Sequence, residues 1–179
     1  KAAIELAEES LVLKRTSLGS DHPEVARSLN TIAMWSMEAG DYATAEPMLR
    51  ESYDINTKAL GDEHPDVASS MTLLASCVVA NGDFDEGYQL AAKAKSIFAA
   101  SLPEGHWRTA VAAGTEGAAL AGLKKYEEAE PLLVDSYAVL SHDSGALSLF
   151  VTESARRLEA LYSAWGKPEK AREYRALLD

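Results

Sequence analysis

Apolar side chains recur every three or four residues along successive stretches of the chain, with polar residues between them. One stripe consists of Val25, Leu29, Ile32 and Ser36, and a later stretch repeats it as Val67, Met71, Leu74 and Val78. This spacing places the side chains on one face of an α-helix. The pair Val78-Val79 is too short for a strand and lies inside a helical stripe, so the pattern predicts helices throughout.

Capping residues and glycines mark where the predicted helices begin and end. His22-Pro23 and His64-Pro65 each precede an apolar stripe, and a polar cap followed by proline favours a helix start. Gly40-Asp41 and Gly82-Asp83 interrupt the stripes, the glycine ending one helix and the aspartate capping the next. These signals predict nine helices, one unpaired helix followed by four antiparallel pairs.

The helical pattern repeats with a period of 42 residues, without insertion or deletion. Gly61 lies 42 residues after Gly19, and Phe84 lies 42 residues after Tyr42. Self-similarity at a fixed period of this size predicts an all-α solenoid of stacked helix pairs. We therefore divide the chain into an unpaired helix at 1–18 and repeats at 19–60, 61–102, 103–144 and 145–179, the last repeat ending in a short charged capping helix.

Two stretches depart from the common pattern. The helix at 1–18 aligns with the second half of a repeat, so we expect it to expose an apolar side and the chain to be part of a longer protein. The helix predicted at 110–122 is built almost wholly of Ala and Gly, and Glu116 takes the apolar position of Ile32 and Leu74. Its glycines either permit a close approach of helices or leave a locally soft element.

The acidic composition excludes several classes of partner. The net charge is −11, from 28 acidic and 17 basic residues. Nonspecific nucleic-acid binding needs a basic stripe that displaces counterions, and an anionic membrane surface likewise attracts basic segments. No apolar run approaches the roughly 18 residues of a membrane span, so we expect neither nucleic-acid binding nor membrane insertion.

The single cysteine, Cys77, excludes a disulfide framework and suits a reducing compartment, so we expect a cytoplasmic protein in which this thiol is packed. The aligned aromatic residues Tyr42, Phe84 and Tyr126 also indicate packing, whereas Trp107 is either a contact residue or a cover over the loop.

The histidines and a glycine-rich tetrapeptide suggest catalytic or metal chemistry that their spacing does not support. His22, His64 and His106 recur once per repeat, and stacked helices lie about 10 Å apart, too far to share a zinc ion. Residues 114–117 lack the Lys-Ser/Thr that follows a phosphate loop, and His142 has no triad partners. We expect helix-capping histidines, and no enzyme, metal or cofactor.

Several motifs together resemble the tetratricopeptide repeat. They are a small residue within each first helix (Ala33, Ala75, Gly117), a Gly-Asp-Tyr turn (40–42) and Ala-Glu-Pro-Met/Leu-Leu in the second helix (45–49 and 129–133). The 42-residue length and the junction Gly-x-x-His-Pro-x-Val-Ala (19–26 and 61–68) resemble the kinesin light chain subtype. The stretch 155–171 also resembles repeat regions that follow bacterial serine/threonine protein kinase domains.

The resemblance implies a right-handed superhelix whose first helices line a concave groove that binds a protein or peptide. The groove positions it implies are Arg27, Asn30, Thr31, Met34, Met37, Ser69, Thr72, Leu73, Ser76, Val79, Val111, Thr115, Arg156 and Arg157. They do not reproduce the Lys, Arg and Asn set that grips a peptide's C-terminal carboxylate, although Arg156, Arg157 and Arg27 suit an acidic segment. The alternatives are solvated helix faces, or a spacer or self-association module of a larger signalling protein.

Overall fold

A computed structural model describes residues 2–142 and 148–178, apart from the side chains of Ala2 and Ala3. Within these residues the chain forms nine α-helices. They are α1 (Ala2–Leu18), α2 (Pro23–Glu38), α3 (Tyr42–Leu60), α4 (Pro65–Ala80), α5 (Phe84–Ser101), α6 (Trp107–Gly122), α7 (Tyr126–His142), α8 (Ser148–Ala164) and α9 (Pro168–Arg175). The expected all-α architecture is confirmed, whereas the predicted start of the last repeat, at residues 144–145, lies outside the described residues.

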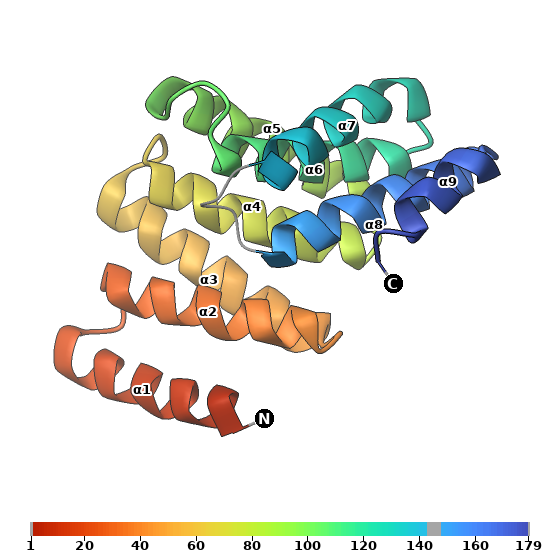
Figure 1. The fold of residues 1–179 in the computed structure, drawn as a ribbon. Coiled ribbons are helices and arrows are strands. Elements are labelled where there is room, and N and C mark those ends of the chain that lie inside the picture. Colours follow the sequence, from red (N-terminus) through yellow and green to blue (C-terminus); the bar gives the residue numbers. More distant parts are fainter. Residues whose placement is uncertain (1, 143–147, 179) are drawn as a thin grey trace.

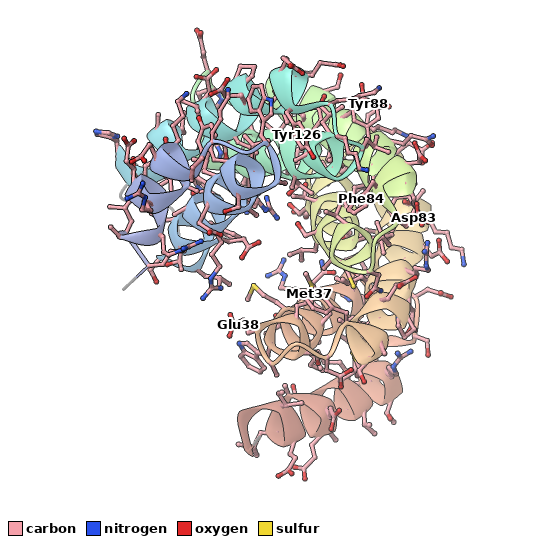
Figure 2. All side chains as sticks on the ribbon, turned by 90° about the vertical axis from the view of Figure 1, so that its right-hand side faces the viewer. Met37, Glu38, Asp83, Phe84, Tyr88 and Tyr126 are labelled. Atoms are coloured by element: carbon pink, nitrogen blue, oxygen red, sulfur yellow. The ribbon has the colours of Figure 1, made fainter. Side chains whose placement is uncertain are left out.

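Consecutive helices pack against each other, and the stack curves into an arc (Figures 1 and 2). Helices α2, α4, α6 and α8 contact one another along the stack, whereas α3, α5 and α7 contact only α2, α4, α6 and α8. The even-numbered helices therefore form the inner, concave side of the arc and the odd-numbered helices form its outer side. This arrangement creates the hollow in which a functional site is expected.

The helix starts have the predicted capping chemistry. The Nδ1 atoms of His22, His64 and His106 accept a hydrogen bond from the backbone N–H two residues later, each at 3.1 Å. Asp41 and Asp83 cap α3 and α5 through their side chains, each accepting from the backbone N–H three residues later. The capping role of the three histidines is confirmed, and each one fixes the point at which an inner helix begins.

The glycines of α6 allow a close approach of helices. A Cβ atom on Gly117 would lie 2.8 Å from Cγ of Leu133, and one on Gly114 would lie 2.5 Å from the Ser136 hydroxyl. A Cβ atom on Gly122 would overlap the ring of Phe84. Of the two alternatives that the sequence left open, the structure therefore supports close packing of α6 on its neighbours rather than a soft helix.

Glu116 is buried in α6, at the position that aligns with the apolar Ile32 and Leu74. Its Oε2 atom lies 2.6 Å from Nζ of Lys95, which reaches across from α5. The pairing compensates the charge that would otherwise be buried alone.

Helix α1 packs on α2 through Ile4, Ala7 and Leu11. Its opposite side leaves Leu6 and Leu13 two-thirds exposed, at 66% and 67%. The expected apolar surface on this helix is confirmed.

Candidate functional site

A cavity of about 460 Å³ lies on the concave side of the arc, between the inner helices (Figure 2). Helix α2 contributes Met34 and Met37 near its end, and α4 contributes Leu73. Val111 comes from the first half of α6, and Phe150 comes from the start of α8. Most of the cavity wall is therefore aliphatic or thioether surface, supplied by helices from both halves of the chain.

One end of the cavity is formed by the guanidinium of Arg157, which is largely buried. Its Nη1 donates to Thr115 Oγ1 at 3.0 Å, and its Nη2 donates to Ser76 Oγ at 3.1 Å. Its Nε lies 3.4 Å from Glu153 Oε1. Burial lowers the pKa of Arg157 and the Glu153 charge opposes that effect, so α4, α6 and α8 together hold a desolvated cation at the cavity wall.

Two further arginines lie at the cavity. Arg156 is more exposed than Arg157, and its Nη1 is 3.8 Å from Oε2 of the same Glu153. Arg108 lies over the ring of Trp107, which in turn stacks on Phe150 with ring centroids 5.6 Å apart. Positive charge is thus concentrated where α6 and α8 line the cavity.

The sequence profile of the tetratricopeptide repeat matches residues 1–55 and 29–98, which together span 98 of the 179 residues. The chain belongs to the tetratricopeptide repeat family. This assignment agrees with the stacked helix pairs and with the concave cavity between the first helices of those pairs.

Solved structures with the same fold include tetratricopeptide repeat (TPR) proteins of the kinesin light chain type. The protein assigned as a kinesin light chain from Podosopora anserina, with nearly identical TPR-like repeats, is 25% identical and has a TM-score of 0.69. A single-substitution variant of that protein is also 25% identical and has a TM-score of 0.71; each match covers 99% of this chain and 84% of that one. BtubC (BKLC) from P. vanneervenii is 18% identical, with a TM-score of 0.70 over 97% of this chain and 69% of that one. No curated protein matches the chain.

Nine of the fourteen expected groove residues of this TPR chain line the cavity. They are Met34, Met37, Ser69, Thr72, Leu73, Ser76, Val111, Arg156 and Arg157. The repeat register therefore located much of the concave surface.

The other five expected residues lie elsewhere. Asn30 donates to the Ser70 hydroxyl in a polar network between α2, α3 and α4, and Thr115 is fully buried beneath Arg157. Val79 contacts Gly87 of α5, because that glycine lets α5 approach the end of α4. The last two are not part of the cavity wall: Arg27 pairs with Glu24 on the surface, and Thr31 donates to the Arg27 carbonyl.

Register alone did not identify several cavity residues, among them Leu149 and Phe150 at the start of α8 and Arg108 near the start of α6. Tyr42 was expected only as a packing residue, yet it also lines the cavity. The one available signal was Trp107, which replaces the proline of the earlier junctions and here carries Phe150 on its ring.

Neither a metal centre nor a membrane span is found in residues 2–142 and 148–178. No group of three or more His, Cys, Asp or Glu side chains there could hold a metal ion. None of the described helices has the length and apolar character needed to cross a bilayer. Cys77 is buried as expected, and burial raises the pKa of its thiol to about 11, which keeps it protonated at neutral pH.

Proposed function

We propose that the chain is a non-catalytic scaffold that binds a peptide or protein segment in the cavity between its inner helices. The observation that carries the proposal is the apolar wall of Met34, Met37, Leu73 and Phe150 beside the arginines of α8. An exposed apolar cavity with a few polar groups at its edge is typical of a ligand or partner site. We keep the division into repeats at 19–60, 61–102, 103–144 and 145–179 as part of this proposal.

The charges favour an acidic or neutral segment over one that ends in a gripped carboxylate. Arg156 and Arg108 lie at the cavity and can pair with an acidic side chain, whereas Arg27 lies outside it. Asn30, which an amide clamp would use, already donates to Ser70. The role of an adaptor for chaperone tails therefore remains disfavoured.

A peptide array probed with the wild-type chain and with two cavity variants tests this function. Met34→Glu and Leu73→Glu each place a charge on the apolar wall, and we expect either change to abolish binding to the peptides that the wild type selects. Tyr88→Glu, on the exposed side of α5, is the matched control and should bind as the wild type does. Peptides that bind all three variants equally would contradict a cavity site.

Self-association is the second candidate function, and the exposed Leu6 and Leu13 of α1 favour it. In this role the chain would be a spacer or assembly module of a larger signalling protein, for which a bacterial serine/threonine kinase remains a prediction that none of the matches supports. Sedimentation velocity separates the two functions. A mass that rises with concentration in the wild type and not in Leu6→Glu/Leu13→Glu would favour self-association. The cytoplasmic location likewise stays a prediction.

A further inference from the structure

The cavity separates an apolar wall from a cationic end. Met34, Met37 and Leu73 line one side, and Leu149 and Phe150 line the other. Arg156 and Arg157 lie at the end formed by α8. A ligand complementary to this surface has a flexible apolar body and a single anionic group at one end.

The two arginines are incompletely neutralised within the protein. They share the carboxylate of Glu153, whose oxygens lie 3.4 Å from Arg157 and 3.8 Å from Arg156, both outside the usual range for a charge-assisted hydrogen bond. A desolvated guanidinium gains most from a carboxylate that meets it at close, bidentate geometry. Two cations facing one distant anion therefore leave room, in charge, for a second carboxylate.

The cavity offers few partners to a polypeptide backbone. Asn30 is the only asparagine or glutamine in the sequence of α2, α4, α6 and α8, and its amide is engaged with Ser70. A peptide buried here would leave its N–H and C=O groups short of partners. An aliphatic chain has no such groups to satisfy.

We propose that the cavity binds a free medium-chain fatty acid. The carboxylate lies against Arg156 and Arg157, and the aliphatic chain lies between Met34, Met37 and Phe150. The cavity volume of about 460 Å³ falls within the range of roughly 300–1,000 Å³ that small-molecule sites occupy. This site goes beyond the proposed peptide-binding function, and a fatty acid and a peptide would exclude each other from the cavity.

Isothermal titration calorimetry with decanoate, below its micelle concentration, tests the proposal on the unmodified chain. We expect one decanoate per chain, and at least tenfold weaker binding of the uncharged decanol, because the alcohol cannot pair with the arginines. Equal affinity for acid and alcohol, or no decanoate binding, would overturn the proposal. The peptide array is read without fatty acid, so either function can fail while the other stands.

Variants locate the site. Arg156→Gln should weaken decanoate binding about tenfold while leaving decanol unaffected, and Met37→Trp should weaken both by filling the apolar wall. Arg27→Gln removes an arginine of the same helix system that lies outside the cavity, and should bind as the wild type does. Arg156 is chosen over Arg157 because Arg157 also holds Ser76 and Thr115, so its loss risks the fold. Unchanged affinity in Arg156→Gln would overturn the assignment of the anionic end.

Discussion

Lys124 adopts a backbone conformation that suits glycine. Its φ is 63°, and it lies at the turn before α7, where the corresponding turns have Gly40 at φ 80° and Gly82 at φ 92°. A left-handed conformation costs a residue with a Cβ atom roughly 1–2 kcal/mol. The turn is nevertheless closed by the same backbone bonds as its counterparts, with the Lys124 N–H donating to the Ala121 carbonyl.

Replacing Lys124 by glycine should therefore stabilise the protein. We expect a gain of about 0.5–1 kcal/mol in the free energy of unfolding, after the greater flexibility of glycine in the unfolded chain is set against the relieved strain. Chemical denaturation measures the change. The reverse substitution Gly82→Lys is the matched control and should cost a similar amount, since no atom crowds that position. A loss of stability in Lys124→Gly would show that the strain is absent.

The buried pair of Glu116 and Lys95 gives a second prediction at this scale. Removing one partner, as in Lys95→Met, leaves an unpaired buried charge and should cost about 3–5 kcal/mol. Replacing both, as in Lys95→Met/Glu116→Leu, should be neutral or stabilising, because Leu74 fills the corresponding buried position of α4. The four unfolding free energies form a double-mutant cycle. A double variant as unstable as Lys95→Met would contradict the argument.

At the scale of the helices, the close contact between α6 and α7 depends on residues without side chains. Gly117 faces Leu133 and Leu132, and Gly114 faces Ser136. Such glycines forgo about 1 kcal/mol of helix propensity each relative to alanine, so their presence reflects the space that α7 occupies.

Gly117→Ala should destabilise the protein by about 1–3 kcal/mol despite its better helix propensity, because the new methyl group overpacks the α6–α7 contact. Thermal and chemical unfolding measure the loss. Leu133→Ala removes the facing side chain, so the double variant should be less unstable than the sum of the two single changes. Strict additivity would indicate that the two residues do not meet.

Local signals predicted the helices well because they act within one or two turns. His22, His64 and His106 cap helices through their immediate neighbours, and the apolar stripes need only the helical period. Groove positions depend on more distant geometry. Asn30 has the register of a groove residue, yet the approach of α4 brings Ser70 within 3.1 Å of its amide. Phe150 enters the cavity because the curvature of the whole stack brings the start of α8 opposite α2, which no repeat register encodes.

At the scale of the whole molecule, ion pairs join successive outer helices. Arg50 of α3 donates to Glu86 of α5 at 2.7 Å, and Lys170 of α9 donates to Glu130 of α7 at 2.8 Å. Hydrogen bonds from Arg50 and Lys170 respectively lower the pKa values of Glu86 and Glu130, and Arg175 does the same for Glu159. The outer side therefore carries carboxylates that favour the charged form in the folded state.

These shifts predict acid sensitivity. Because the folded-state pKa values lie below the ordinary 4.5, the unfolded chain binds more protons on acidification, and stability present above pH 4.5 is lost as pH falls through the lowered values. Unfolding free energies measured from pH 7 to pH 3 should show this fall. Glu86→Gln should flatten it, whereas Glu128→Gln, at an exposed carboxylate on α7, should not. Identical slopes for both variants and the wild type would contradict the assignment.

The hydrogen bond from Arg157 to Ser76 joins residues 81 positions apart and passes over α6. In a simple solenoid each unit contacts only its neighbours, so unfolding can spread from an end one unit at a time. Here α8 cannot detach without releasing α4, which couples the loss of three inner helices into one cooperative event. Helices α1 and α2 lie outside this tie, so the amino-terminal end can fray while the rest of the stack remains folded.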